Sequence, residues 1–453
     1  MKTDCNELQL EFQGLGRQKI QVSKGHQESS SDGGLIALHA MEKKYAIIRR
    51  LARCFQDNRR PNQIKHEVFT LLLQRIFGLC QGYEDLNDHE DLRNDVLLRH
   101  LCGKNGGDIL GGKSTLNRLE LGKEIDEEIP HRYNRITWDD DAIQDLMLEI
   151  FLDNYQNDKE PIILDFDATD DPLHGDQEGR FFNGYYDNYC YLPLYVFCGS
   201  WILAAKLRTS DRDAADGSLE VLQRIVQAIR QRHPHKPIIF RGDSGFCRTY
   251  LLDWCEDNNV GYVVGMARNK RIVRAIGGEL HEAKNRFEEI GKSQRIFTHI
   301  AYKTKTSWRQ ARRVVCKAEY LRKGQNPRFV VTNLCDKEWP PKELYEDLYC
   351  ARGDMENRIK EQQLYLFADR TSTAWMSSNQ LRLWFSSFAY LFFVILREKL
   401  LGETDWKTKQ ASTLRLKLLK VSALVKITCR AIKVQFPISY PYWDAWIHLS
   451  QAS

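Results

Sequence analysis

The chain has 453 residues, of which 42% are hydrophobic and 11% aromatic, so a disordered chain is excluded and two or three domains are expected. The formal net charge is only +5, so charge alone defines no partner. The first residues lack the apolar run of a signal peptide, and the 12 cysteines form no C-x-x-C pair. We therefore expect a cytoplasmic protein without a structural zinc site.

Positive charge is concentrated in three separate stretches. Residues 41–65 hold eight Lys or Arg against two acids, residues 303–328 hold nine against one acid, and residues 407–433 hold eight and no acid. Three such stretches fit a protein that binds a long polyanion at several places. The alternative is that each stretch is an ordinary solvated face.

The first third of the chain reads as mainly helical. Residues 6–22 alternate weakly and predict one or two short strands, and residues 29–34 predict a turn. Helical periodicity then runs from Leu35 to about Gly122, broken by glycines at 103–112. The sequence STLNRLE from Ser114 predicts a short helix like the second helix of a helix-turn-helix.

The middle of the chain predicts a mixed sheet with crossover helices. Strands are expected at 161–167, 189–198, 201–207, 237–243 and 261–267, with helices at 139–157, 214–232 and 248–258. Residues 294–335 then predict three antiparallel strands with a basic bias. A long helix at 339–365 and a second at about 378–399 follow.

Three carboxylates lie on elements suited to metal-dependent phosphodiester chemistry. Asp167 and Asp243 end apolar strands, and Glu356 lies in the long helix. Acids held on rigid elements can bind two Mg²⁺ ions that stabilise the attacking and leaving oxygens. The alternative for each Asp is a turn or helix N-cap.

One face of the long helix supports this interpretation. Tyr349, Arg352, Glu356 and Lys360 stand at offsets 0, 3, 7 and 11 and share that face. Glu would bind a metal ion, whereas Arg and Lys would bind phosphate oxygens. The alternative is a solvent face on which Glu356 and Lys360 form an ordinary i, i+4 pair.

The sequence also resembles a known family across nearly its whole length. The segments LDFDATDDPLHGDQEGRFFNGYYDNYCYLPLYVFCG (164–199), FRGDSGFCRTYLLDWCE (240–256) and YCARGDMENRIKEQQLYLFADRTS (349–372) are similar to bacterial insertion-sequence transposases with a DDE domain of group one. The N-terminal segments LEFQGLGRQKIQV, SSDGGL, GYEDLNDHEDLR and STLNRLE resemble the same family.

The resemblance implies a ribonuclease-H-like α/β fold, a mixed sheet core with an inserted antiparallel β subdomain. The implied parts are an N-terminal DNA-binding region at 1–135, a catalytic core at 136–279 and 336–400, a β-rich insertion at 280–335 and a basic C-terminal region at 401–453. The implied partners are double-stranded DNA, at the element's terminal repeats and its target, and a second copy of the chain in a dimer.

The family's motifs place its catalytic triad on this chain. The match implies that Asp167, Asp243 and Glu356 bind two Mg²⁺, or Mn²⁺, and that Tyr349 and Arg352 belong to the same signature. The signature's final Lys is replaced by Gln363, so Lys360 is the candidate substitute. Asp165 remains an alternative to Asp167, and Asp354 remains an alternative to Glu356.

DNA contacts are expected in two further places. In the insertion, Trp308 could stack on an unpaired or flipped base beside Arg309, Arg312 and Arg313, although it could equally pack on the sheet. In the N-terminal region, base edges or phosphates are expected to meet the residues Arg49, Arg50, Ser114, Thr115, Asn117 and Arg118.

Two other functions remain open from the sequence. Gly107 to Ser114 matches G-x-x-x-x-G-K-S, the phosphate-binding loop of ATPases, with the strand at 162–167 as a candidate Mg²⁺ ligand. That loop requires a preceding buried strand, but VLLRHLCGKNG looks helical. A DNA-binding protein without catalysis is the other alternative.

Overall fold

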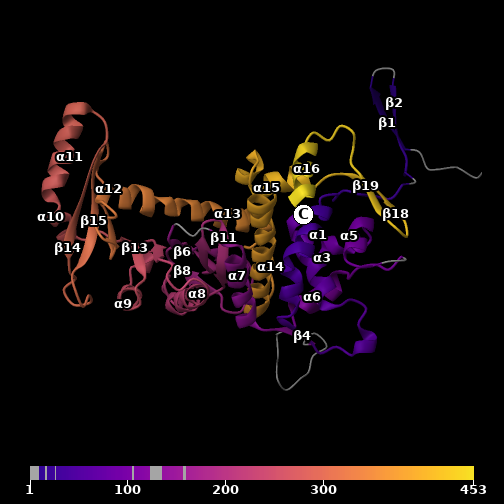
Figure 1. Cartoon of the computed structure of the whole chain (residues 1–453), viewed down its shortest axis with the longest axis horizontal. Coiled ribbons are helices and arrows are strands. Elements are labelled where there is room, and N and C mark those ends of the chain that lie inside the picture. The colour runs from indigo at the N-terminus through magenta and orange to yellow at the C-terminus, as the bar shows by residue number, and fades with distance from the viewer. Residues whose placement is uncertain are drawn as a thin grey trace, which may run out of the picture.

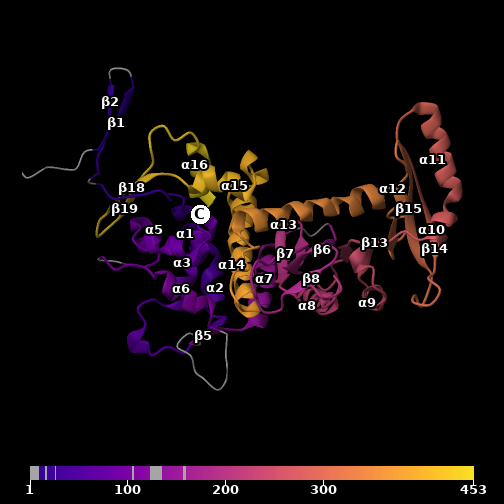
Figure 2. The ribbon, with the colours of Figure 1, turned by 180° about the vertical axis from the view of Figure 1, so that it is seen from behind.

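The structure is a computed structural model that describes residues 10–15, 18–25, 27–104, 107–122, 135–156 and 160–452. The molecule is elongated (Figures 1 and 2). The N-terminal helices lie on one side of the long helix α14 (Met376–Ile395), and the strands of the main sheet lie on the other. The helix α11 (Gly277–Ile290) stands beyond that sheet, at the end farthest from the N-terminal helices.

The N-terminal region is mainly helical, as predicted. Strands β1 (Leu10–Leu15) and β2 (Gln18–Val22) pair antiparallel and precede the helices. The helices are α1 (Leu35–Tyr45), α2 (Ile47–Ala52), α3 (Val68–Gln81), α4 (His89–Leu92), α5 (Val96–Leu101) and α6 (Lys113–Glu120), with the 3₁₀ turns η1 (Pro61–Gln63) and η2 (Leu86–Asp88).

Two strands in this region escaped prediction: β3 (Ser29–Ser30), where a turn was expected, and β4. Residues 55–57 form β4 (Phe55–Asp57), which pairs with β5 (Ile136–Trp138). The pairing is short and non-local, so helical periodicity on either side concealed it.

The main sheet has nine strands and is mixed, which confirms the predicted class. Its order is β11-β10-β6-β12-β13-β17-β15-β14, with β16 (Gly324–Gln325) on β15. Strands β6, β12 and β13 are parallel, whereas all other neighbours are antiparallel. The bounds are β6 (Ile162–Ala168), β10 (Leu194–Cys198), β11 (Trp201–Lys206), β12 (Ile238–Gly242), β13 (Gly261–Met266), β14 (Gln294–Tyr302), β15 (Arg312–Leu321) and β17 (Arg328–Thr332).

The region predicted as an inserted β subdomain does not form a sheet of its own. Its three strands are present, but β17 pairs with β13, so β14, β15 and β17 extend the main sheet. Residues up to Ile290 belong to α11, a helix that the prediction missed. Pairing with β17 covers the β13 edge, which would otherwise offer unpaired backbone groups.

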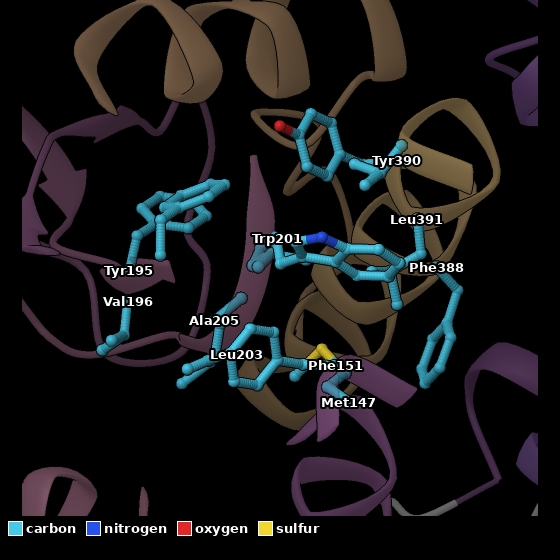
Figure 3. Packing of buried hydrophobic residues seen from close by; sticks show 14 of the residues in the cluster. Met147, Phe151, Tyr195, Val196, Trp201, Leu203, Ala205, Phe388, Tyr390 and Leu391 are labelled. Carbon is cyan, nitrogen blue, oxygen red and sulfur yellow. The ribbon is translucent and has the colours of Figure 1, made fainter. Parts of the chain in front are cut away.

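Two helices from distant parts of the chain cover the same end of the sheet. The predicted helix α7 (Asp140–Asn154) begins at Asp139, whose carboxylate caps it. Figure 3 shows Phe151 and Met147 of α7 gathered with Trp201 and Leu203 of β11 and with Phe388 and Leu391 of α14. The crossover helices are α8 (Ser218–Arg232) and α9 (Thr249–Asp257).

Helix α14 and the turn η6 (Leu396–Leu400) that continues it are long and apolar enough to cross a membrane by length and composition alone. However, 89% of the most apolar window is buried inside the protein. Burial among α3, α7 and the sheet is typical of a central core helix, and that packing accounts for its apolar composition.

The predicted helix at 339–365 is present but is not uniformly α-helical. It comprises α12 (Pro341–Glu343), a π-helical turn η4 (Leu344–Tyr349), a 3₁₀ turn η5 (Cys350–Arg352) and α13 (Gly353–Leu366). π-helical turns within helices are often found at functional sites. This turn alters the rotation between Leu344 and Arg352 from that of a regular helix.

The remaining elements surround this core. They are β3 (Ser29–Ser30), β7 (Asp171–Pro172), β8 (Phe181–Asn183), β9 (Asn188–Tyr191), η3 (Ser244–Phe246), α10 (Lys270–Ala275), η7 (Asp405–Thr408), α15 (Ala411–Leu414), η8 (Arg415–Leu419), β18 (Ala423–Ile427), β19 (Ile432–Gln435) and α16 (Trp443–Ala452). Strand β18 pairs with both β19 and β3, so the C-terminal region packs back onto the N-terminal region.

Candidate active site

Two of the predicted acids lie side by side at the carboxyl ends of parallel strands. β6 and β12 are neighbours in which Gly242 pairs with Phe166, so Asp243 follows β12 beside Asp167 of β6. Asp243 also accepts a hydrogen bond from the Gly245 N–H at 2.8 Å. Its carboxylate therefore caps a turn, as the alternative interpretation expected, and still lies next to Asp167.

The long helix brings the third acid to the same place through an arginine. Arg352 Nη1 donates to Asp167 Oδ2 at 3.1 Å, and its Nη2 donates to Glu356 Oε1 at 3.4 Å. The side chain of Asp167 is 15% exposed, whereas that of Glu356 is 52% exposed. One guanidinium thus joins a strand-end carboxylate to a helical one that faces solvent.

The electrostatics of Asp167 reflect this crowding of carboxylates. Burial is the largest effect and raises its pKa, and the carboxylates of Asp243 and Glu356 act in the same direction. Arg352 and the Ala168 N–H lower the pKa, and the balance raises it to about 6. A buried acid whose pKa is raised by two neighbouring carboxylates is typical of a site that takes up a cation.

Asp165, the alternative to Asp167, has a different role. It pairs with Arg241 across the β6–β12 register, with Arg241 Nη2 at 2.7 Å from Asp165 Oδ2. Arg241 also donates to the Leu348 carbonyl oxygen, so this buried pair fastens η4 to the sheet. Both side chains are under 10% exposed. This pair could not be predicted from the sequence, because its recognition requires the strand order.

The other residues singled out on the predicted helix have different surroundings. Tyr349 packs close to β13: a Cβ placed on Gly265 would lie 2.5 Å from the Tyr349 hydroxyl, so glycine allows this approach. Lys360 is exposed. Gln363, which stands in the place of the family's Lys, donates to the Asp170 carbonyl oxygen at 3.1 Å and so ties α13 to the loop after β6.

A cavity of about 520 Å³ opens beside Tyr349 and Ser244. Arg268 and Arg328 also line it, together with Tyr345. These cationic and aromatic side chains were not among the predicted site residues, since they are scattered along β13, β17 and η4.

The carboxylates of Asp167, Asp243 and Glu356 are ligands that suit a hard divalent cation, but they are not arranged as a preformed metal site. Asp and Glu oxygens are the ligands that Mg²⁺ prefers. In the described residues, no three His, Cys, Asp or Glu side chains are arranged to hold a metal ion as they stand. The Arg352 guanidinium pairs with both Asp167 and Glu356 and offsets part of their negative charge.

The basic residues around Trp308 are occupied by protein acids. Trp308 is 5% exposed, lies edge-to-face on Tyr302 with ring centroids 5.8 Å apart, and is covered by the Arg312 guanidinium. Arg312 and Arg309 pair with acids of α9, and Arg313 pairs with Asp336. The expectation of an indole open to a DNA base is therefore corrected, because Trp308 packs on the sheet.

The predicted N-terminal contacts also separate into two groups. Arg50 pairs with Glu149 and Asp153 of α7, both at 2.8 Å, and Arg49 lies over the Phe69 ring. On α6, Ser114 and Arg118 are exposed, whereas Thr115 and Asn117 are partly buried. Thr115 and Arg118 line a cavity of about 550 Å³ that also includes Arg135, a residue that the sequence did not single out.

The P-loop interpretation is wrong on structural grounds. The described residues that precede the loop, 96–104, form the helix α5 and a turn, not a buried strand. The Lys113 N–H, which would bind phosphate, donates instead to the Glu90 carboxylate at 2.8 Å, and Lys113 Nζ donates to Asn87 at 3.2 Å. A Cβ on Gly112 would lie 2.7 Å from side-chain atoms of Arg93 and Glu90.

Carboxylates clustered at the strand ends of a mixed α/β sheet are typical of enzymes that process phosphodiesters with divalent metal ions. Comparison with protein families then identifies the particular family: the sequence model described as transposase DDE domain group 1 matches residues 12–452, and the chain belongs to that family. Transposases with this domain generally use divalent metal ions.

The chain was also compared with curated proteins and with solved structures. No curated protein matches the chain significantly. Among solved structures, the chain is similar to one described as a piggyBac transposase synaptic complex with hairpin DNA, determined by cryo-electron microscopy. The identity is 12%, the TM-score is 0.44, and the match covers 87% of this chain and 82% of that one.

Proposed function

We propose that the chain is a DNA transposase that cuts the ends of a mobile element and joins them to target DNA, with Asp167, Asp243 and Glu356 as its catalytic acids. The observation that carries the assignment is the shared Arg352 contact with Asp167 and Glu356, beside Asp243. Family membership supports the reaction class. In this proposal, the strands from β11 to β13 form a ribonuclease-H-like core.

Two Mg²⁺ ions, or Mn²⁺, would be held by these three acids and would supply Lewis-acid stabilisation of the attacking and leaving oxygens. Within the chain, Asp167 and Asp243 are fixed by strand ends, whereas Glu356 extends from α13 into solvent. In this proposal, the exposed Glu356 side chain moves towards the two aspartates.

Arg352 is the residue whose contacts must change when phosphate enters. Its guanidinium now pairs with Asp167 and Glu356 and offsets part of their charge, a task that a bound divalent cation would take over. The guanidinium would then be free to donate to a phosphate oxygen of the scissile strand. Lys360, one turn further along α13 from Glu356 and exposed, would assist as a second phosphate contact.

The partner in this proposal is double-stranded DNA, at the element's ends and in the target, and the working assembly is a homodimer that holds two ends. The expected location is the cytoplasm. Cleavage of a duplex carrying the flanking element's end, with the cut positions mapped, tests the reaction. Asp243→Ala should remove Mg²⁺-dependent cutting and spare binding of the duplex. Normal cutting by Asp243→Ala would overturn the triad, and binding without cutting by the wild type would favour a non-catalytic DNA-binding protein.

A further inference from the structure

The cavity beside α6 is lined by positive side chains that come from three separate segments. It has a volume of about 550 Å³ and is framed by the η1 turn, helix α6 and the start of β5. The residues that matter for its charge are Arg59, Arg60, Lys65, Arg118 and Arg135, and no Asp or Glu among the described residues lines it. We call this cavity the α6 pocket.

Most of these charges have no acidic partner within the part of the chain that the structure describes. Arg59 is the exception, because it makes a bidentate pair with Asp57 at 2.8 and 2.7 Å and also donates to the His66 carbonyl oxygen. Arg59 thus fixes the loop that carries the pocket. The side chains of Arg60, Lys65, Arg118 and Arg135 are exposed and form no ion pair with a described acid.

The α6 pocket differs in this respect from the other basic regions. Arg50 is held by two acids of α7, and Arg309 and Arg312 are held by acids of α9. Their charges are largely balanced within the protein. A pocket with several unbalanced cations instead attracts an external polyanion.

The pocket also contains a partly buried histidine. Burial lowers the pKa of His66, and the nearby cations Lys104, Arg59, Arg93 and Lys65 lower it further. Its buried Nδ1 has no hydrogen-bond partner among the described residues. The imidazole therefore adds a polar side chain to the lining.

Helix α6 is a rigid support for this pocket. Leu116 and Leu119 are fully buried, and Glu120 at its end is held by Arg75 at 2.9 Å and by Arg382 at 2.7 Å. Thr115 and Arg118 lie one turn apart on an adjacent face of the helix and line the α6 pocket. Side chains on a fixed helix hold a phosphate backbone in one register.

We propose that the α6 pocket binds consecutive phosphates of duplex DNA. This inference rests on the proposed function and deepens it, because it locates a DNA-binding surface away from the proposed catalytic acids. Both views place α6 on the other side of α14 from β6, the strand that carries Asp167 (Figures 1 and 2). The pocket should therefore govern affinity, and the acids should govern cleavage.

The test is a fluorescence-anisotropy titration of the full chain, in EDTA, against a labelled duplex of arbitrary sequence over a range of salt concentrations. The pocket variant is Arg118→Gln with Arg135→Gln. The control variant is Arg50→Gln with Arg309→Gln, which removes the same charge from arginines that are already paired. Circular dichroism and thermal melting check that both variants fold.

The pocket variant should bind about 10- to 100-fold more weakly at low salt, and the slope of log Kd against log salt should fall by about 2, since each lost phosphate contact removes about one unit. The control should change little. Unchanged affinity, or an unchanged salt slope, would overturn the proposal. Tighter binding of an RNA duplex than of the DNA duplex would overturn the assigned partner. If the pocket variant binds DNA normally while Asp243→Ala still abolishes cleavage, the α6-pocket proposal fails but the proposed catalytic triad does not. Failure of one proposal can therefore be told apart from failure of the other.

Discussion

Arg352 donates to Asp167 across 185 positions of sequence, and this contact joins the end of a buried strand to the middle of a long helix. The same guanidinium reaches Glu356 one turn further along that helix. The three side chains thus form a group with one positive and two acidic members, drawn from a strand and a helix that lie far apart in the sequence.

Replacing Glu356 by Gln should reduce Mg²⁺-dependent cleavage by about 10³-fold or more, the scale on which removal of a charge-stabilising group acts. The matched control is Asp354→Asn, an exposed acid two residues earlier on the same helix. That variant should cleave at the wild-type rate. Single-turnover cleavage under saturating protein measures both. Loss of activity in Asp354→Asn with normal activity in Glu356→Gln would exchange their roles.

The pH dependence of stability should report on Asp167. Its pKa is about 6 in the folded protein and about 4 in an unfolded chain, so its favourable contribution is complete below about pH 4 and is lost as pH rises towards 6. Without divalent ions, the Tm of the wild type should therefore fall across that window relative to Asp167→Asn. Mg²⁺ at pH 7 should raise the Tm of the wild type more than that of the variant. Parallel pH profiles for the two proteins would count against a buried, crowded carboxylate.

Breaking the Asp165–Arg241 pair should unfold the protein more readily. Asp165→Ala leaves Arg241 buried without its partner, which costs about 3–5 kcal/mol of stability. Urea unfolding at neutral pH measures this loss. The pair Asp165→Leu with Arg241→Met should recover much of it. A small loss in Asp165→Ala would show that solvent reaches Arg241.

Trp308 should behave as a core residue. Trp308→Ala should lose about 3–5 kcal/mol, because it removes the ring that packs between Tyr302 and Arg312. Trp308→Phe should keep both the rate and the position of DNA cleavage. A normal Tm with a specific loss of cleavage in Trp308→Phe would restore the base-stacking role.

ATP should have no effect on this protein. Lys113 is engaged by Asn87, and its backbone N–H is engaged by Glu90, so Lys113→Ala should leave DNA cleavage unchanged. Addition of ATP with Mg²⁺ should shift the Tm no more than Mg²⁺ alone, because a ligand stabilises only a protein that binds it. An ATP-dependent Tm shift that Lys113→Ala abolishes would contradict this.

The sequence predicts the elements of the core well because their patterns are local. The apolar runs before Asp167 and Asp243 are buried strands, and Pro341 begins the helix that carries Glu356. The contacts of charged residues are not local. Arg312 forms an ion pair with Glu256 on α9, and Arg50 forms one with Glu149 on α7. Because each partner lies far away in the sequence, neither pair can be recognised from the neighbouring residues. A stretch rich in arginine therefore does not by itself show which arginines are available to DNA.

The helical run from Pro341 to Leu366 enters two different hydrophobic cores. Leu344, Tyr345 and Leu348 pack with the outer strands, whereas Met355, Ile359 and Leu366 belong to the main core. Arg352 and Glu356 lie at the junction, just after the π-helical turn. Tightening that turn into a regular α-helix without removing a residue would rotate Glu356 relative to Tyr345, because each α-helical residue turns by about 100° and each residue of the wider turn turns by less. The wide turn thus sets the angle at which the two anchored halves present their side chains.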